Sequence, residues 1–161
     1  MTPEDQVTEG RFVLRVRPYD DPEVVRMVAE VQAEYVRLYG GPDEAAVQPE
    51  EFAAPLGLFL VGTLDGDPVA TGGWRKLEDD RAEIKRMYVA RRARRRGLSR
   101  LVLAELERTA ALAGVTRLVL NTGPEQPEAI ALYEQQGYTP VAGFGHYVVY
   151  PDAVFLGKDL G

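Results

Sequence analysis

The chain has 161 residues, a formal net charge of −6 and a hydrophobic content of 45%, which are ordinary values for one globular domain. It contains no cysteine and a single histidine, His146. These two counts exclude a disulfide framework, a thiolate nucleophile and a zinc site built from cysteines or several histidines. A Ser-His-Asp triad would depend on His146, which follows a Gly-Phe-Gly run with no nucleophile-elbow motif nearby.

Alternating apolar residues predict strands, and apolar residues at helical spacing predict helices. In chain order the pattern predicts a strand at 12–17, a helix at 22–39, strands at 58–64, 68–76 and 81–89, a helix at 98–113, a strand at 115–120, a helix at 126–136 and a strand at 153–156. This order predicts an α+β fold with a mixed sheet, in one domain that spans 11–161. We expect the polar residues 1–10 to be disordered and the proline-containing segment 42–56 to be a loop.

The sequence offers no membrane or export signal. The longest nearly apolar run, 57–64, is too short to span a membrane. The first ten residues lack the charged and apolar regions of a signal peptide. We therefore expect a cytoplasmic protein with no membrane partner.

Positive charge is concentrated in one place. Residues 91–100 read RRARRRGLSR, with six arginines and no acidic residue, whereas 13 basic residues face 25 acidic ones in the rest of the chain. A basic cluster on an otherwise acidic chain predicts a local anionic ligand better than a general affinity for nucleic acid.

The basic cluster lies where the predicted strand 81–89 passes through a glycine-containing loop into the helix that begins at Leu98. A helix N-terminus offers unpaired backbone N–H groups and the positive end of the helix dipole, and arginines bind phosphate oxygens. The segment therefore favours a pyrophosphate site, although neither a Walker loop nor a Rossmann fingerprint is present. A solvated basic helix start and a nucleic-acid patch are the alternatives that these residues leave open.

Two motifs carry a resemblance to a known family. The run Glu83-Ile-Lys-Arg-Met-Tyr-Val89, followed by Arg94-Arg-Arg-Gly97-Leu-Ser99, resembles motif A of the GNAT acyltransferase superfamily. Residues 120–138 resemble motif B, with the core A-x-x-L-Y-E-x-x-G-[YF]. The combination of EIKRMYV, TGPEQPEAIALYE and FGHY is similar to a common bacterial subgroup of that superfamily. Two positions depart from the pattern: Ser99 replaces the usual Gly or Ala, and Gln126 stands near a frequent Asn.

The resemblance implies the GNAT fold, a mixed central sheet of six to seven strands flanked by about four helices. In that fold an acyl thioester of coenzyme A lies in a V-shaped splay between two parallel strands, here 81–89 and 115–121. Backbone groups of Met87 and Val89 are then expected to pair with the pantetheine arm, and the N–H groups of residues 94–99 to hold the pyrophosphate. One of three arginines, Arg91, Arg92 or Arg95, is expected to reach the 3′-phosphate. The implied cofactor-binding residues are Met87, Tyr88, Val89, Arg94, Arg95, Arg96, Gly97, Leu98, Ser99, Asn121 and Gln126.

The chemistry implied by the resemblance is direct attack of an amine on the thioester carbonyl, without a metal. It needs a proton for the leaving thiolate, and Tyr133 matches the family's general acid; packing of Tyr133 in the core is the alternative. Glu83 is the candidate base, on the expectation that it shares one strand face with Met87. The alternatives are that Glu83 forms an ion pair with Lys85 or Arg86, and that water takes the proton.

Other residues are candidates for the acceptor side. Tyr35, Tyr39 and Phe52 are expected to line the acceptor pocket, because the N-terminal helices usually wall it in this superfamily. Asn121 is expected to bond the pantetheine amide or the acceptor, or else to cap a turn. Trp74 is expected in the core, and His146 at the surface with Tyr147 beside it.

The sequence therefore predicts an acetyl-CoA-dependent N-acetyltransferase that acts on a small primary amine, and a homodimer is left open. Acetylation of a protein N-terminus or lysine, and a non-catalytic acyl-CoA-binding module, are the alternatives. An arginine-patch nucleic-acid binder is the rival outside this class; it would show steep salt dependence and no affinity for coenzyme A.

Overall fold

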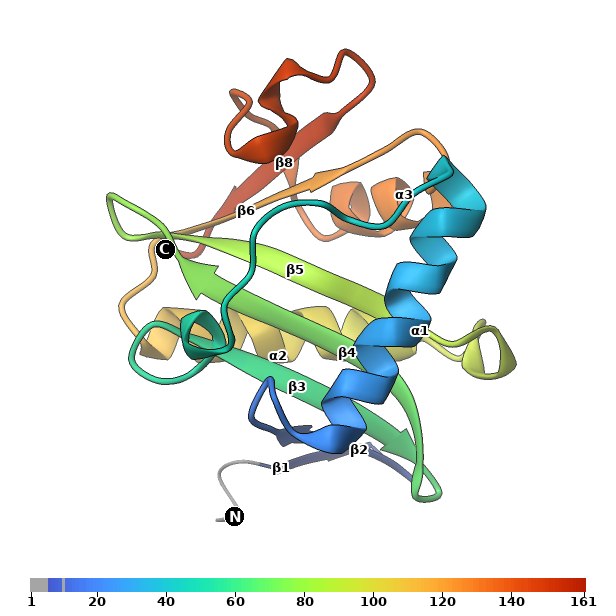
Figure 1. The fold of residues 1–161 in the computed structure, drawn as a ribbon. Helices are drawn as coiled ribbons and strands as arrows, with labels where there is room; N and C mark the ends of the chain where they lie inside the picture. Colours follow the sequence, from blue (N-terminus) through green and yellow to red (C-terminus); the bar gives the residue numbers. More distant parts are fainter. Residues whose placement is uncertain (1–5, 10) are drawn as a thin grey trace.

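A computed structural model describes residues 6–9 and 11–161, and residues 1–5 and 10 lie outside the described part. One sheet with the order β1-β2-β3-β4-β5-β6-β8-β7 runs through the molecule (Figure 1). The strands are β1 (Gln6–Glu9), β2 (Phe12–Val16), β3 (Gly57–Leu64), β4 (Asp67–Lys76), β5 (Arg81–Val89), β6 (Arg117–Thr122), β7 (Thr139–Pro140) and β8 (Val154–Asp159). The α-helices are α1 (Pro22–Tyr39), α2 (Leu98–Leu112) and α3 (Pro127–Gln135), and the short 3-10 helices are η2 (Pro49–Phe52), η3 (Arg91–Ala93) and η4 (His146–Val149).

The α+β class and the mixed sheet predicted from the sequence are confirmed. The described residues form an 8-stranded sheet and three α-helices, so the sheet is larger and the α-helices fewer than expected. The additional strands are the two-residue β7 and β1. Strand β1 lies in the segment that was expected to be disordered and pairs antiparallel with β2. In the part of the chain that the structure describes, no helix is long and apolar enough to cross a membrane.

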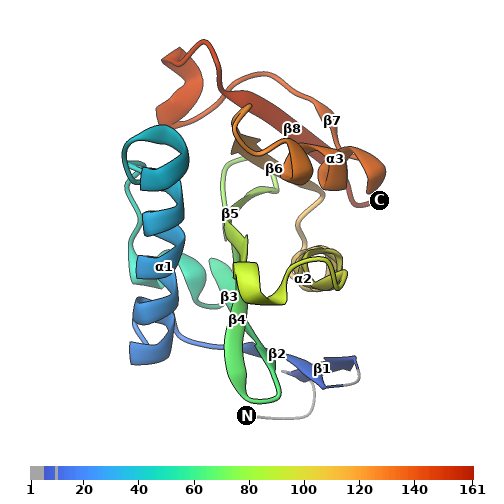
Figure 2. The ribbon, with the colours of Figure 1, turned by 90° about the vertical axis from the view of Figure 1, so that its right-hand side faces the viewer.

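The sheet has helices on both faces (Figure 2): α1 covers one face, and α2 and α3 lie on the other. The first apolar cluster lies on the α2 face and includes Trp74 of β4. The indole N–H of Trp74 donates to the Thr109 hydroxyl of α2 at 3.0 Å. A second apolar cluster lies on the α1 face, where Phe59 of β3 packs edge-on against Phe52 of η2. Burial of these two clusters fixes the sheet between its helices.

Strands β5 and β6 separate along their length. They are parallel, and they pair only at Arg81, Ala82 and Glu83, which lie opposite 117–119. Beyond this point β6 continues to pair with β8 on its other side as far as Thr122. The two strands therefore form the expected V-shaped splay, which is confirmed.

A bulge in β5 lies beside the splay. The register between β4 and β5 shifts between Thr71 and Gly73, and Arg86 has a positive φ of 61°. The Thr71 hydroxyl donates to the Arg86 carbonyl oxygen at 2.7 Å and holds this conformation in a buried position. An extra residue in one strand reverses the alternation of side chains beyond it.

The reversal separates Glu83 from Met87. Glu83 pairs with Arg75, whose guanidinium also contacts Glu51 of η2 on the α1 face. Met87 instead packs into the α2-side core, where its sulfur lies near Gly72. The expectation that Glu83 and Met87 share one face is therefore wrong, because the bulge at Arg86 lies between them.

Candidate active site

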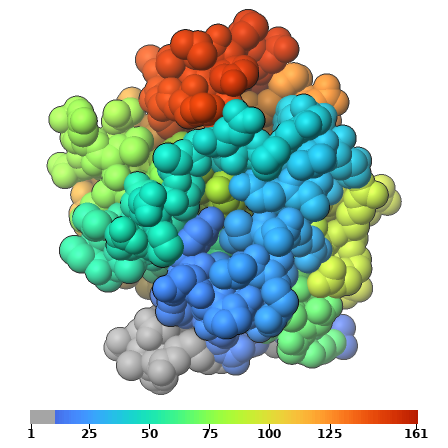
Figure 3. Space-filling model, viewed as in Figure 1, coloured from blue at the N-terminus to red at the C-terminus, as the bar shows by residue number. Residues whose placement is uncertain are grey.

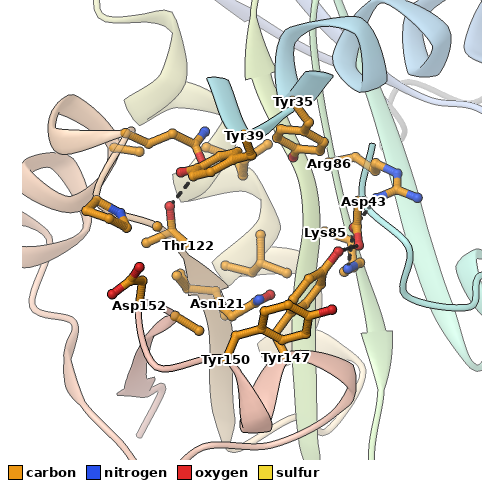
Figure 4. A pocket seen from close by; sticks show the side chains of 18 of the residues that line it. Tyr35, Tyr39, Asp43, Lys85, Arg86, Asn121, Thr122, Tyr147, Tyr150 and Asp152 are labelled. Atoms are coloured by element: carbon orange, nitrogen blue, oxygen red, sulfur yellow. Dashed lines mark hydrogen bonds and ion pairs between the residues drawn. The ribbon is translucent and has the colours of Figure 1, made fainter. Parts of the chain in front are cut away.

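Two cavities meet at the splay between β5 and β6. The smaller has a volume of about 400 Å³ and lies beside the end of α1 and the segment after it (Figure 4). The larger has a volume of about 870 Å³ and lies beside the N-terminus of α2. In the space-filling view, atoms of β5 form the floor of the opening between α1 and the segment after it (Figure 3). Both cavities are lined by Tyr35, Met87, Gln126, Ala129 and Tyr133.

The larger cavity contains a set of free backbone donors. None of the residues that the structure describes accepts a hydrogen bond from the N–H groups of 95–99, whereas the N–H of Arg94 is bonded to the Arg91 carbonyl at 3.3 Å. Arg95 and Gly97 have positive φ values of 67° and 74°, which turn this loop into the start of α2. Free N–H groups at the N-terminus of a helix form an anion site. The residues present therefore fit a pyrophosphate group.

Most of the expected cofactor residues line the larger cavity. These are Met87, Tyr88, Val89, Arg94, Arg95, Gly97, Leu98, Ser99 and Gln126. Two are not among its lining residues: Arg96 is exposed, and Asn121 lines the smaller cavity. The side chain of Arg96 is therefore not placed to contact a ligand in this cavity, although its backbone N–H is one of the free donors.

The arginines of the basic cluster have different surroundings. Arg92 is bound by Asp67 at 3.0 Å and by Glu30 at 3.3 Å, whereas Arg91 and Arg95 line the larger cavity. Arg94 donates from Nε to the Val89 carbonyl at 2.8 Å, so that carbonyl already has a partner from the chain itself.

Tyr133 lies on α3 between the two cavities. It is 5% exposed, and its ring meets Tyr138 edge-on at 5.6 Å between ring centroids. Burial raises the pKa of the Tyr133 phenol far above its ordinary value, with a smaller contribution from nearby Tyr35. The phenol therefore stays protonated at neutral pH, which a proton donor requires.

Glu83 has a structural partner instead of a place in a cavity. Its carboxylate accepts from Arg75 at 3.0 Å and 3.1 Å, and it is not among the residues that line either cavity. The partner is neither Lys85 nor Arg86, the two cations that the sequence offered. A carboxylate held in this way, outside both cavities, is poorly placed to take a proton from an acceptor amine.

A charged cluster occupies one wall of the smaller cavity. Asp43, in the segment after α1, accepts from Lys85 Nζ at 2.7 Å and is also bonded by Arg86. The Tyr147 hydroxyl of η4 donates to the other Asp43 oxygen at 2.7 Å and accepts from the Glu44 N–H at 2.8 Å. Burial opposes ionisation of Asp43, but the charge and hydrogen bond of Lys85, with the other donors, hold its pKa well below the ordinary value.

Gln126 lies at the junction of the two cavities and precedes α3. Its side-chain carbonyl accepts from the Tyr39 hydroxyl and from the Thr122 hydroxyl, each at 3.2 Å. These bonds connect the end of α1 to the end of β6 across the opening of the splay. The Gln126 amide therefore links α1 to β6 at the opening of the site.

The remaining sequence expectations have mixed outcomes. Tyr35 and Tyr39 line the smaller cavity as expected, but Phe52 does not, since it is buried against Tyr19 at 4.8 Å between ring centroids. Trp74 lies in the core, and His146 is exposed against the ring of Tyr147.

Sequence reasoning missed three functional candidates, Asp43, Lys85 and Arg86, which the cavity brings together. Lys85 and Arg86 were considered only as ion-pair partners of Glu83. The feature that could have identified them is a pair of positive residues in the middle of strand 81–89, where the strand is buried. No group of three or more residues that could hold a metal ion occurs within residues 6–9 and 11–161.

A splayed parallel strand pair, with a helix N-terminus at one side and a second cavity at the other, defines the class of acyl-CoA-dependent acyltransferases. The family model described as the acetyltransferase (GNAT) family matches residues 25–138, and the chain belongs to this family.

Relatives and solved structures agree with the family. An "IAA acetyltransferase" from Azospirillum brasilense is 32% identical over 149 residues, which cover 92% of this chain and 97% of the relative. A protein of Escherichia coli, described as the N-acetyltransferase YjgM, is 30% identical over 134 residues, with 77% and 79% of the two chains covered. A crystal structure from Klebsiella pneumoniae, assigned as an acyl-CoA N-acyltransferase, superposes with a TM-score of 0.80 at 27% identity, and covers 95% of this chain and 100% of the other.

Proposed function

We propose that this protein is an acetyl-CoA-dependent N-acetyltransferase that acts on a primary amine of a small molecule. The observation that carries the proposal is that both cavities are lined by Met87 and by the buried Tyr133. A thioester that enters from the larger cavity and an amine that enters from the smaller one would then meet beside a protonated phenol.

The larger cavity is the side proposed for coenzyme A. The free N–H groups of 95–99 would bind the pyrophosphate, and Arg91 and Arg95 line the same cavity and would bind the 3′-phosphate. The Val89 carbonyl accepts from the Arg94 side chain at 2.8 Å, and its second lone pair would be available to the pantetheine arm.

The proposed reaction is a direct transfer. The nitrogen lone pair of the neutral amine attacks the thioester carbonyl, a C–N bond forms and the C–S bond breaks. The amine loses one proton to water, and the departing thiolate takes one from the Tyr133 phenol, which is reprotonated from solvent. We assign the base role to water rather than to Glu83, because Arg75 holds that carboxylate outside both cavities.

The acceptor is proposed to be small because of how the smaller cavity is enclosed. Its volume of about 400 Å³ suits a small molecule. The bond between Tyr147 and Asp43 joins the two segments that flank the cavity, 40–48 and 141–153. A polypeptide acceptor would need an open groove, and this connection obstructs one.

The proposal is tested by incubating the protein with acetyl-CoA and a panel of small amines, with release of free thiol as the readout. We expect amine-dependent thiol release and an N-acetylated product identified by mass spectrometry. Acetyl-CoA binding without any acceptor-dependent turnover across a broad panel would instead favour a non-catalytic acyl-CoA-binding module. Turnover restricted to peptide acceptors would contradict the small-molecule assignment.

A further inference from the structure

We propose that the acceptor carries a carboxylate in addition to its amine, and that Lys85 and Arg86 bind this carboxylate. The proposal rests on the proposed transferase function and names the chemical class of its acceptor.

The side chains of Lys85 and Arg86 are more buried than is usual for lysine and arginine. The side chains of Lys85 and Arg86 are each 4% exposed, and both residues line the smaller cavity (Figure 4). They are consecutive in β5, where an alternating strand would direct them to opposite faces. The bulge at Arg86 instead brings both to the same carboxylate, that of Asp43.

The charges of the buried side chains that line the smaller cavity do not balance. Lys85 and Arg86 share one carboxylate, Asp43, and the other carboxylates that line the cavity, Glu44 and Asp152, are exposed. Neither of these two forms an ion pair with Lys85 or Arg86 within the residues that the structure describes. Arg75 is shared by two carboxylates, those of Glu83 and Glu51, but neither of these lines the cavity. Among the lining residues one buried positive charge is therefore left over, and an uncompensated buried charge is costly.

Hydrogen-bond donors are also left over. An ammonium group has three donors, and Lys85 Nζ has one partner, Asp43, among the described residues. The Arg86 guanidinium donates from one terminal nitrogen to Asp43 and from Nε to the Tyr19 hydroxyl at 3.4 Å. Its second terminal nitrogen has no hydrogen-bond partner within the described chain. An anionic group of the acceptor would supply both the missing charge and the missing acceptors.

A carboxylate bound here would orient the acceptor. The same cavity is lined at its junction with the larger one by Met87 and Tyr133. An acceptor fixed at one end by Lys85 and Arg86 has its remaining length inside a cavity of about 400 Å³. An amino acid has its amine and carboxylate at the short separation that such a cavity allows.

The competing explanation is that Lys85 and Arg86 only hold the segment of Asp43 against the sheet. That role predicts no preference for carboxylate-bearing acceptors. The two explanations are separated with matched acceptor sets: several amino acids, their carboxamides and their decarboxylated amines. Phenylalanine, phenylalaninamide and phenethylamine form one such set.

The experiment measures thiol release from acetyl-CoA by the wild-type protein for each set. We expect kcat/KM for the amino acid to exceed that of its amide by about tenfold or more, as for one charge-assisted contact. Equal or better use of the amides would overturn the proposal. This comparison needs no variant, so it stands even if a substitution prevents folding.

Variants of Lys85 and Arg86 test whether these two residues cause the preference for the carboxylate. Lys85→Gln and Arg86→Gln are expected to lower the ratio of kcat/KM for the amino acid to kcat/KM for its amide about tenfold or more. Lys158→Gln is the matched control, since Lys158 is ion-paired to Glu107 and lines neither cavity. An unchanged preference for the acid in both folded cavity variants would overturn the assignment of these residues.

Calorimetry separates this proposal from the transferase function. Titrations use acetyl-CoA, the amino acids and their amides as probes. Binding of amino acids over amides supports the carboxylate site even if no turnover is found, while loss of acetyl-CoA binding would count against the transferase alone. A protein that binds acetyl-CoA but binds and acetylates the acids no better than the amides would overturn the carboxylate site and leave the transferase standing.

Discussion

The Tyr147 hydroxyl donates a hydrogen bond of 2.7 Å to Asp43, a residue 104 positions earlier in the chain. The same hydroxyl accepts from the Glu44 N–H at 2.8 Å. One phenol therefore ties the segment after α1 to η4 and closes one side of the acceptor cavity. The shape of that cavity depends on a contact between the N-terminal and C-terminal parts of the chain.

Tyr147→Phe removes both hydrogen bonds and keeps the ring. We expect the free energy of unfolding to fall by about 1–2 kcal/mol and the KM for the acceptor to rise, while the affinity for acetyl-CoA is unchanged. Urea unfolding and steady-state kinetics measure the two effects. Tyr150→Phe is the stability control, because the Tyr150 hydroxyl forms no hydrogen bond within the described residues. Equal stability of the Tyr147 variant and wild type would contradict the role of this contact.

The Tyr133 hydroxyl forms no hydrogen bond with residues 6–9 or 11–161, so Tyr133→Phe removes the proposed proton donor without breaking one there. We expect kcat to fall by about 10²–10⁴, with the dissociation constant of acetyl-CoA within about twofold of wild type. Stopped-time thiol assays and calorimetry check the two quantities. A turnover number that is unaffected by the substitution would show that Tyr133 is a core residue and not the acid.

The pH dependence follows from the same side chain. An ordinary tyrosine loses its proton near pH 10, and burial raises the pKa of Tyr133 above that value. The acid form is therefore fully present below pH 10 and is lost only as the pH rises through the raised pKa. We expect kcat to show no loss from pH 7 to pH 9 in the wild-type protein. A fall in kcat with an apparent pKa below 9 that is absent from the Tyr133→Phe profile would contradict this assignment.

The two ends of α2 provide a matched pair of glycines for testing the pyrophosphate site. Gly97 precedes the helix with φ 74°, and Gly114 follows it with φ 87°, so alanine is strained at both positions. We expect both variants to lose about 1–2 kcal/mol of stability, whereas Gly97→Ala alone weakens acetyl-CoA binding, by about tenfold or more. Calorimetry on both variants decides the point. A similar loss of affinity in the Gly114 variant would mean that the effect is general.

The arginine cluster is expected to divide into two kinds. Arg91 and Arg95 line the larger cavity, while Arg92 is already paired with Asp67 and Glu30. Arg91→Ala or Arg95→Ala should therefore reduce the preference for coenzyme A over 3′-dephospho-coenzyme A, and Arg92→Ala should leave that preference unchanged. Competitive binding of the two ligands measures the ratio. A lower preference for coenzyme A in the Arg92→Ala variant alone would contradict this division of the arginines.

The part of the site that lies in one continuous segment could be predicted from the sequence. The strand, the glycine-containing loop and the start of α2 are neighbours in the chain, and the geometry of 95–99 follows from local rules. The splay of β5 and β6 came from the family resemblance and not from periodicity.

The part of the site that depends on distant contacts could not be predicted. Lys85 and Asp43 are 42 positions apart, and nothing in either segment specifies that they meet. Glu83 was misplaced for a different reason. A single extra residue at Arg86, held by the Thr71 hydroxyl, reverses the face of every later side chain, and strand periodicity assumes that no such residue exists.

The splay between β5 and β6 and the N-terminus of α2 are proposed to bind a coenzyme A thioester. Isothermal titration of the wild-type protein with acetyl-CoA measures this binding before any acceptor is known. We predict saturable binding of one molecule per chain with a micromolar dissociation constant. Absence of binding at millimolar acetyl-CoA would show that this cavity is not a coenzyme A site.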